Sequence, residues 1–344
     1  MPKFMGVFGQ FCQHRIGWHR IGVVLSLSII AGAAVVLYHL LRDINIDEII
    51  VSIRATSLRD IYYAAAFVAA GYFTLTFYDL FALRTIGRHD VPYRIAALAA
   101  FTSYSVGHNI GASVFSAAAV RYRIYSAWGL DAAEVTKLCF IAGLTFWLGN
   151  ATVLGLGIVY VPEAASAINQ FPPWVNRGLA ILTLTILYCY IVWVWRSSRV
   201  IGFGQWQVRL PGGLLTLLQI LIGIVDLSFC TLAMYMLLPN EPHLGFVTLG
   251  VIFVSATLLG FASHAPGGIG VFDAAMLIAL WQYDKEELLA GLLLFRLLYY
   301  IVPFTLSLAI LGTRELLLSF FPPPAITPPG KTAKEGIVKQ KTDV

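Results

Sequence analysis

The sequence predicts an all-α integral membrane protein: a polytopic helical bundle of about six full spans and two re-entrant, broken helical hairpins, arranged as an inverted repeat. Three observations support this fold class. Of the 344 residues, 58% are hydrophobic and 12% are charged, whereas a soluble domain carries about a quarter charged residues. Several apolar segments approach twenty residues, enough to cross the roughly 30 Å hydrocarbon core of a bilayer. Other apolar segments are shorter and come in two adjacent pairs.

The long apolar segments are the predicted spans. They cover residues 21–41, 61–83, 133–160, 178–195, 213–238 and 287–312. The first follows a basic segment, as in a signal peptide, but it is too long for a typical one and predicts an uncleaved span. Before the second span, one helical face carries a row of isoleucines, which is typical of a helix lying in the membrane interface. These are Ile46, Ile49, Ile50 and Ile53.

The short apolar segments predict two hairpins, because each is too short to span the bilayer comfortably. The first pair is 95–107 with 111–120, joined by a turn that contains His108 and Asn109. The second pair is 246–262 with 269–281, joined by a Pro-Gly-Gly run. Each pair is expected to enter and leave the membrane on one side.

The turn of the second hairpin is the strongest local signal in the chain. Proline removes a backbone donor, and glycine permits backbone angles that other residues avoid. Lipid offers no hydrogen bonds, so irregular backbone at membrane depth survives only when it is packed in protein or lines a wet cavity. Broken helices of this kind often hold the cargo of a transporter. We therefore expect substrate contacts at the helix-breaking residues Pro266, Gly267, Gly268 and Gly270.

Basic residues assign sides to the connections. Arginines cluster at 84–94 and 196–209, which marks these stretches as cytoplasmic, whereas 161–176 and 239–245 contain neither Lys nor Arg and are expected outside. The basic tail, 313–344, is predicted to be cytoplasmic and disordered. The N-terminal segment, residues 1–20, is also expected in the cytoplasm, in an inner membrane.

These sides agree only if the first hairpin enters from the cytoplasm and the second from outside. The transmembrane domain, 21–312, then divides into two repeats of opposite orientation, 21–160 and 178–312. Inverted repeats that meet at discontinuous helices are a common transporter plan. The alternative is a set of ordinary apolar segments whose similarity is accidental.

Charged residues inside apolar segments need a partner or a function, because each costs about 2.5–3.5 kcal/mol at the bilayer centre. Arg121 and Arg123 end the first hairpin; they are either interfacial anchors or guanidinium groups that grip a lipid phosphate bidentately. Asp273 and Arg296 either form a structural ion pair between the second hairpin and the last span or contribute to the site.

Other polar residues have simpler explanations. Asp79 and Asp226 are expected to make contacts between helices. Glu134 and Lys137 are three residues apart, and a local pair explains them. Histidines 108 and 264 lie in the two turns, where their titration would link transport to protons or where they are simply hydrogen-bonded turn residues.

Several classes of function are excluded by the motifs that the sequence lacks. It contains no glycine-rich phosphate loop, no zinc-type Cys and His spacing and no nucleophile elbow. Its four cysteines are widely scattered and are expected to be small buried hydrophobes. The net charge of +5 comes from connections and the tail, so it indicates topology rather than nucleic-acid binding. No cofactor and no metal are expected.

Three motifs together resemble the lysylphosphatidylglycerol synthase transmembrane-region family. The segment from Val120 to Tyr125 is similar to its Arg-Tyr-Arg motif, and Pro266 to Asp273 resembles its second signature. Arg296 matches its arginine in the last span. The resemblance covers about residues 15–320, with two departures: Asp273 replaces the usual Glu, and three alanines precede Arg121 where relatives are often richer in glycine.

The resemblance implies a flippase-like module that moves phospholipid between leaflets, in the type case aminoacylated phosphatidylglycerol. Family members that synthesise this lipid carry an additional soluble acyltransferase domain, and only a short tail follows the last span here, so we expect no enzyme. The predicted partners are anionic or aminoacylated phospholipids, with a second copy of the chain or a separate lipid-synthesising enzyme. The alternatives are an accessory protein that binds lipid or a partner without transport, and an enzyme acting on polyprenyl-linked sugars.

Overall fold

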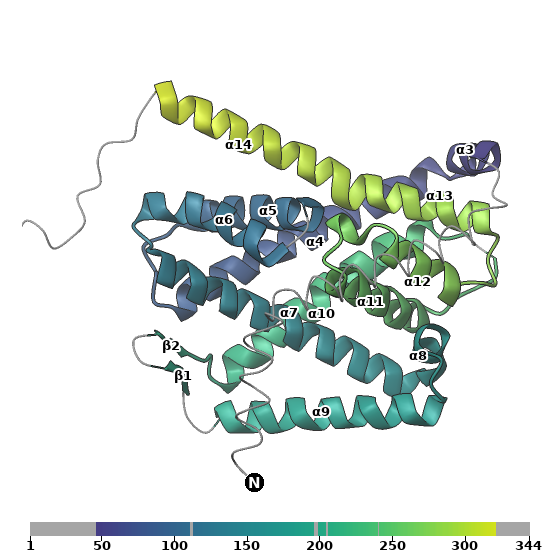
Figure 1. The fold of residues 1–344 in the computed structure, drawn as a ribbon, viewed down its shortest axis with the longest axis horizontal. Coiled ribbons are helices and arrows are strands. Elements are labelled where there is room, and N and C mark those ends of the chain that lie inside the picture. The colour runs from purple at the N-terminus through teal and green to yellow at the C-terminus, as the bar shows by residue number, and fades with distance from the viewer. Residues whose placement is uncertain (1–45, 111–112, 196–198, 204–205, 240, 321–344) are drawn as a thin grey trace, which may run out of the picture.

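The protein is an all-α bundle with one small β-hairpin. The computed structural model describes residues 46–110, 113–195, 199–203, 206–239 and 241–320. The predicted span at 21–41 and the N-terminal segment lie outside these residues. Elements carry the labels of Figure 1, which begin at α3.

The order of elements follows the predicted segments closely. In the first half they are α3 (Ile46–Ala55), α4 (Leu58–Thr85), α5 (Tyr93–Ile110), α6 (Ser113–Tyr125), η1 (Ser126–Trp128), α7 (Ala132–Tyr160) and α8 (Pro162–Asn169). In the second half they are α9 (Pro173–Trp195), β1 (Val200–Phe203), β2 (Trp206–Arg209), α10 (Gly213–Leu237), α11 (Phe246–Ala262), η2 (Pro266–Gly268), α12 (Val271–Ala279), α13 (Lys285–Arg296), η3 (Leu297–Ile301) and α14 (Val302–Phe320). The antiparallel pair β1–β2, in which Val200 lies opposite Arg209, was not predicted.

Among the described residues, five helices are long and apolar enough to cross a membrane: α4, α7, α9, α10 and the continuous stretch from Lys285 to Arg314. They coincide with five of the six predicted spans, and they confirm an all-α polytopic membrane protein. The last helix continues to Phe320, past the predicted end at residue 312. The isoleucine row before α4 is helical as predicted, in α3, and none of its described side chains is fully buried.

The two short pairs form helical hairpins that occupy opposite ends of the bundle. In Figure 1, α5 and α6 lie at one end, and α11 and α12 lie at the other. Helices α9 and α14 run along opposite sides. Helices α4 and α10 pack on each other in the interior, where the side chain of Tyr78 donates to Asp226.

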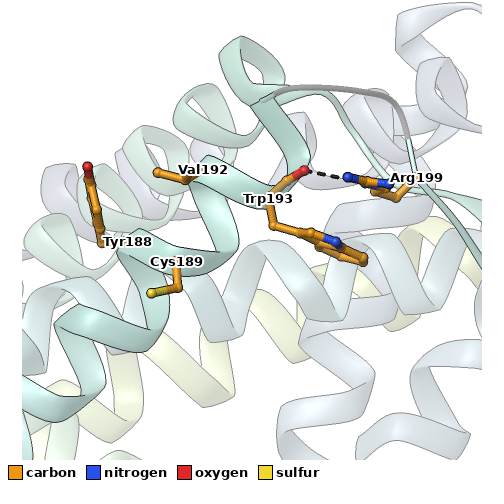
Figure 2. A pocket seen from close by; sticks show the side chains of 5 residues that line it. All are labelled: Tyr188, Cys189, Val192, Trp193 and Arg199. Carbon is orange, nitrogen blue, oxygen red and sulfur yellow. Dashed lines mark hydrogen bonds between the residues drawn. The ribbon is translucent and has the colours of Figure 1, made fainter.

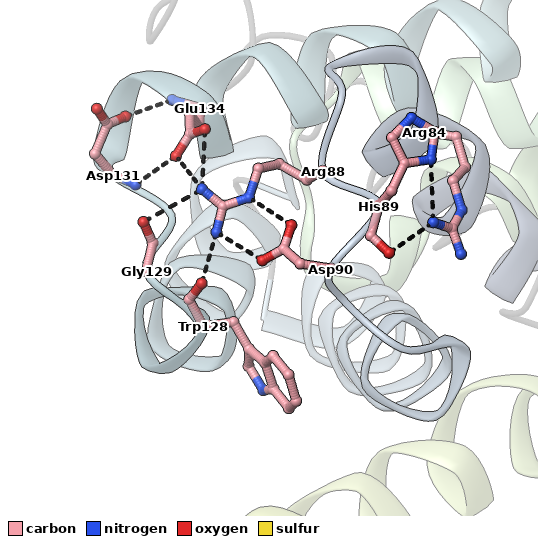
Figure 3. A network of polar contacts seen from close by, with 8 residues as sticks. All are labelled: Arg84, Arg88, His89, Asp90, Trp128, Gly129, Asp131 and Glu134. Atoms are coloured by element: carbon pink, nitrogen blue, oxygen red, sulfur yellow. Dashed lines mark hydrogen bonds and ion pairs between the residues drawn. The ribbon is translucent and has the colours of Figure 1, made fainter. Parts of the chain in front are cut away.

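The base of the first hairpin is closed by Arg88, as Figure 3 shows. Its Nε and Nη2 donate to the Asp90 carboxylate at 3.1 and 3.2 Å, and its Nη1 lies 3.2 Å from both Glu134 oxygens. Its Nη2 also donates to the carbonyl of Trp128 at 2.6 Å. Residues before α5 and after α6 are thereby tied together, so the hairpin begins and ends at the same place. Glu134 thus pairs with Arg88, and the predicted local pair with Lys137 is wrong. The Glu134 carboxylate turns back toward the start of α7, where it also accepts from the Asp131 amide at 3.1 Å.

The second hairpin is closed by a tyrosine. The hydroxyl of Tyr283, after α12, donates to the carbonyl of Pro242, before α11, at 2.7 Å. The helix that follows each hairpin then starts on an aspartate cap: Asp131 accepts from the backbone of Glu134, and Asp284 accepts from two backbone amides. Each cap satisfies amides that a helix N-terminus leaves open. The two hairpins therefore share a plan of closed base and capped exit.

Glycines allow a close helix crossing in the bundle. A β-carbon added at Gly149 of α7 would lie 2.7 Å from the Cα of Gly223 in α10, well inside van der Waals contact. A β-carbon at Gly143, one and a half turns earlier on α7, would meet nothing within 4 Å. The bare backbones of Gly149 and Gly223 thus let α7 and α10 touch, which is how small residues stabilise helix pairs in lipid.

Gly149→Ala is expected to force α7 and α10 apart and to destabilise the protein by about 1–3 kcal/mol, the usual cost of overpacking. Thermal unfolding of purified protein in detergent measures the effect. Gly143→Ala on the same helix is the control and should unfold as the native protein does. Equal stability of the two variants would contradict the crossing.

Arg88→Ala should weaken the base of the first hairpin by about 1.5–3 kcal/mol, because it removes charge-assisted hydrogen bonds to two carboxylates and a carbonyl. Arg88→Lys should recover only part of the loss, since an ammonium has no planar fork. The measurement is again thermal unfolding in detergent, with Arg54→Ala on the exposed face of α3 as the matched control. An Arg88→Ala protein as stable as this control would show that the network contributes nothing.

Candidate functional site

The turn of the second hairpin meets the end of α5 inside the bundle. The turn after α11 passes through left-handed backbone at His264, Gly267, Gly268 and Gly270, with φ of 57°, 60°, 61° and 82°. Three of these four positions are glycine, the residue that adopts positive φ without steric cost. A β-carbon added at Gly267 would lie 3.8 Å from the backbone oxygen of His108, near the end of α5. The two hairpins are therefore in contact at the break of the second one.

Arg296, at the end of α13, holds the second turn in place. Its Nε and Nη2 donate to the two carboxylate oxygens of Asp273 at 3.0 and 2.7 Å, and its Nη1 donates to the Gly267 carbonyl at 3.1 Å. The guanidinium also lies 5.7 Å from the centre of the Tyr300 ring. Both charged side chains are 14% exposed. The bidentate pair that the sequence offered as one interpretation of Asp273 and Arg296 is thus formed.

Asp273 also shapes the turn itself. Besides the arginine, its Oδ2 accepts from the backbone N–H of Gly270 at 3.0 Å. This amide belongs to the first turn of α12, where helical backbone donors have no carbonyl to bind. A single carboxylate therefore neutralises Arg296 and caps the short helix that follows the break.

A π-helical turn follows Arg296 and exposes backbone carbonyls to the site. Residues Leu297–Ile301 form this turn, and Pro303 comes two residues later without a backbone donor. The carbonyl of Tyr299 accepts instead from the Tyr72 hydroxyl of α4 at 3.0 Å, and that of Tyr300 accepts from Nδ2 of Asn109 in α5 at 3.2 Å. Side chains from the first half of the chain thus satisfy the break in the last span.

His108 is half-buried among aromatic rings. Its ring stacks on Tyr299 at 5.9 Å between centroids and lies as close to Tyr104. Its Nδ1 has no hydrogen-bond partner among the described residues. His264, in contrast, is exposed, and its Nδ1 lies 2.9 Å from the carbonyl of Ala262. Of the two predicted turn histidines, only His108 faces the place where the hairpins meet.

Arg121 lies in a different position from the one that a phosphate clamp requires. Its Nε and Nη2 bind the Asp79 carboxylate at 2.8–3.1 Å, and the hydroxyl of Tyr125 donates to the same carboxylate at 2.8 Å. The arginine is 5% exposed and Asp79 is fully buried. Tyr104 lies 4.6 Å from the guanidinium as a cation–π partner. The predicted helix contact of Asp79 is therefore an ion pair between α4 and α6, while Arg123 is exposed on α6.

The structure therefore divides the predicted site residues into three groups. The turn and its contacts bring together Gly267, Gly270, Asp273, Arg296, His108 and Asn109. Pro266 begins the short 3-10 turn, and Gly268 packs against Gly260 of α11, where a β-carbon would lie 3.2 Å from the Gly260 Cα. The arginine pair of the first hairpin, Arg121 and Arg123, is not part of this contact.

Two surface pockets lie away from the turns. The first, of about 360 Å³, is lined by Tyr188, Cys189, Val192, Trp193 and Arg199 at the end of α9 (Figure 2). There Nε of Arg199 donates to the Trp193 carbonyl at 3.4 Å, as Figure 2 shows. The second, of about 390 Å³, is an apolar groove between α7, α10 and α11. Within the described part of the chain, no group of three or more His, Cys, Asp or Glu side chains is placed to bind a metal.

Comparison with known proteins identifies relatives over most of the chain. No protein-family model matches the sequence. The uncharacterized protein slr0712 of Synechocystis is 30% identical over 255 residues, which cover 74% of this chain and 79% of the relative. The inner membrane protein YbhN of Escherichia coli is 27% identical and covers 85% of this chain and 91% of its own length.

The phosphatidylglycerol lysyltransferase of Staphylococcus haemolyticus is 26% identical over 306 residues, which are 85% of this chain but 33% of the enzyme. The chain thus spans about a third of the lysyltransferases that it matches. The chain belongs to the lysylphosphatidylglycerol synthase transmembrane-region family. The family resemblance in the three sequence motifs is confirmed.

The sequence motifs did not predict the tyrosine contacts of the site. Tyr72, Tyr104, Tyr299 and Tyr300 pack around His108 or bind the broken last span. The signal that was available is Pro303 inside a long apolar segment, which predicts a freed carbonyl four residues earlier. Which helix would supply the donor is a matter of three-dimensional packing.

Arg296→Met should leave Asp273 buried without its partner and cost about 3–5 kcal/mol. The double variant Arg296→Met with Asp273→Asn should recover much of this loss, because Asn keeps an oxygen for the Gly270 amide and carries no charge. The coupling energy between Arg296 and Asp273 is obtained from the thermal unfolding of four proteins: the native protein, the two single variants and the double variant.

The control is the same cycle at Arg59 and Asp60, an exposed pair at 3.4 Å. Its coupling should stay below about 1 kcal/mol. If the coupling between Arg296 and Asp273 is no larger than that of the control, the pair does not hold the turn.

Proposed function

We propose that this protein is a phospholipid translocase, a flippase-like module that moves a phospholipid between the leaflets of the inner membrane. One observation carries the proposal: the end of α5, in the first half of the chain, meets the broken turn after α11 beside a partly exposed arginine, among helices long and apolar enough to span a bilayer. Irregular backbone at membrane depth is retained where it lines a cavity or binds a substrate.

Arg296 is the residue that we assign to the lipid phosphate. A guanidinium has five N–H donors, of which three are engaged by Asp273 and Gly267 among the described residues. The remaining donors suit a phosphate oxygen, the anion that Arg grips best. Asp273 neutralises the arginine while no lipid is bound, so that a cation is never left unpaired in the bundle. Asp273 thereby acts as the brace or gate of the site.

Arg121 is better explained as a structural residue in this proposal. Its contacts with Asp79 are already bidentate and almost fully buried. Breaking them to admit a phosphate would leave the Asp79 carboxylate buried and unpaired, at a cost of about 3–5 kcal/mol. Arg123, which is exposed on α6, is the member of the pair that we assign to headgroup contact at the membrane surface.

The proposed lipid is a phosphatidylglycerol derivative, including the aminoacylated form. Support comes from the name of the lysyltransferase relatives, which refers to phosphatidylglycerol. Support for the inner membrane comes from the name of the relative in Escherichia coli. The positive-inside pattern favours cytoplasmic termini and two inverted repeats, 21–160 and 178–312. The shared plan of the two hairpins, each with a closed base and an aspartate-capped exit, supports the repeat.

Transport rather than catalysis suits the chemistry of the site. The place where the hairpins meet offers a guanidinium group and aromatic rings, and its backbone carbonyls are bound by Tyr72, Asn109 and Arg296. Among the described residues it does not present a nucleophile with a base beside it, which group transfer requires. Binding and release are the steps that such a site serves, and the proposed activity is therefore not enzymatic.

Proteoliposomes with fluorescent phosphatidylglycerol test the function directly. The native protein should accelerate the exchange of the lipid between leaflets, measured as the fraction that an impermeant reductant quenches over time. Arg296→Ala should slow exchange at least tenfold, as expected for the loss of about 1.4 kcal/mol or more of phosphate binding. Arg296→Lys should restore part of the rate, since it keeps the charge without the fork.

The matched control is Arg177→Ala, which removes an exposed arginine from α9 and should leave exchange unchanged. Circular dichroism and size-exclusion profiles establish that the variants are folded. Native protein that binds phosphatidylglycerol without accelerating exchange would overturn transport in favour of an accessory lipid-binding role. Full activity of a folded Arg296→Ala protein would overturn the phosphate assignment.

A further inference from the structure

Asp226 is a buried carboxyl group in the middle of α10. The residue is 5% exposed. Its Oδ2 accepts a hydrogen bond from the Tyr78 hydroxyl at 3.1 Å. Its Oδ1 has no hydrogen-bond partner among the described residues. That oxygen faces α4, where a β-carbon added at Gly71 would lie 3.9 Å away.

The environment of Asp226 differs sharply from that of Asp79, the other buried aspartate between helices. Asp79 accepts three contacts from Arg121 and one from Tyr125, all at 2.8–3.1 Å. That set neutralises a full negative charge. Asp226 has one tyrosine, and it forms no ion pair within the part of the chain that the structure describes. An isolated carboxylate is among the most costly groups to bury, so such a group neutralises itself by binding a proton.

Within the described part of the chain, the groups that interact with Asp226 supply no positive charge. The titratable groups that interact with it are Tyr72 and Tyr78 on α4, Tyr104 on α5, Tyr299 on η3 and Cys230 on α10 itself. All five are hydroxyl or thiol groups, which carry no cation.

Among the described residues, the remaining neighbours of α10 contribute no charge at the contacts that the structure shows. Helix α7 meets it through Gly149 and through Thr145, which binds Gln219. Helix α11 meets it at Thr231 through Gly250. Helices α13 and α9 meet it at its two ends, where Gly291 packs on Leu237 and Trp195 packs on Gly213. Arg121 of the first hairpin lies over the Tyr104 ring and is held by Asp79.

A chain of contacts links Asp226 to the proposed lipid site. A β-carbon added at Gly71 would lie 3.7 Å from Sγ of Cys230 and 3.9 Å from Oδ1 of Asp226, so these two side chains are neighbours. The Cys230 thiol donates to the Tyr299 hydroxyl at 3.6 Å. The Tyr299 ring stacks on His108, where the two hairpins meet. Two further buried polar atoms on this side lack a partner among the described residues: Ser105 Oγ and His108 Nδ1. Unpaired polar atoms inside a protein are the usual positions of ordered water.

We propose that Asp226 is a proton-binding site, and that release and uptake of its proton are coupled to lipid movement; the coupling rests on the proposed function. With α4 and α10 packed together, the carboxyl group is neutral. When these helices, which belong to opposite predicted repeats, move apart, water reaches Oδ1. The carboxyl O–H bond then breaks, the proton passes to water as hydronium, and the electron pair stays on the carboxylate. Relative motion of two repeats is how such folds alternate access.

Infrared difference spectroscopy of the full-length protein in lipid tests the proton site independently of transport. Native minus Asp226→Asn spectra at neutral pH should show a protonated carboxyl stretch that shifts in D2O. Tyr78→Phe, which removes the one hydrogen-bond donor, should move this band without abolishing it. Asp284→Asn, at an exposed helix cap, is the matched control and should remove only ionised carboxylate bands. Loss of ionised carboxylate bands alone in Asp226→Asn would overturn the proposal.

The coupling is tested in proteoliposomes with an imposed pH gradient. The rate at which the native protein exchanges fluorescent phosphatidylglycerol should change with the direction of the gradient. Asp226→Asn, locked in the neutral form, should lose this response. A gradient response that persists in Asp226→Asn would overturn the coupling. If the native protein exchanges no lipid, the proposed function and the coupling both fail, whereas the infrared result still decides whether Asp226 binds a proton.

Discussion

Hydrocarbon offers neither hydrogen bonds nor counterions, so every polar group that the chain carries between its apolar helices must find a partner inside the protein. The described contacts follow this constraint. Arg296 satisfies the turn carbonyl of Gly267 while Asp273 satisfies Arg296. Tyr72 and Asn109 satisfy the carbonyls that the π-helical turn leaves open. The partners come from distant parts of the sequence, and the helix breaks are therefore also the points where the two halves of the bundle are joined.

The two arginine–aspartate pairs have the same chemistry but different surroundings. The pair of Arg121 and Asp79 is in contact with Tyr125 and Tyr104, and it fixes the first hairpin to α4. The pair of Arg296 and Asp273 is more exposed, borders glycine backbone and caps a short helix. A pair closed off from solvent is suited to stability, and a more exposed pair is suited to binding. We therefore assign a structural role to the more buried pair and a functional role to the more exposed one.

The sequence predicted a large part of the architecture and less of the site. Five predicted spans, the helix that carries the isoleucine row and both helical hairpins are present where the apolar pattern and turn residues indicated them. The turn glycines were predicted because positive φ demands them, and the ion pair of Asp273 and Arg296 was one of two interpretations. The role of Arg121 was harder to predict, because nothing in the local sequence tells which of Asp79 and Asp226 lies beside it. The partner of Glu134 was predicted wrongly for the same reason: Arg88 is 46 residues away in the chain.

The sequence by itself determined what can be read from composition and local spacing: a helical membrane bundle, the places where its helices break and the charges that it must bury. Those properties depend on the length of apolar segments and on the backbone preferences of proline and glycine, which act within a few residues. The tertiary structure decided the partners. Gly149 meets Gly223, Tyr72 binds Tyr299, and Asp226 is bound by Tyr78 and by no cation of the described residues. These outcomes depend on which helices touch and at what level, a property of packing that no local pattern encodes.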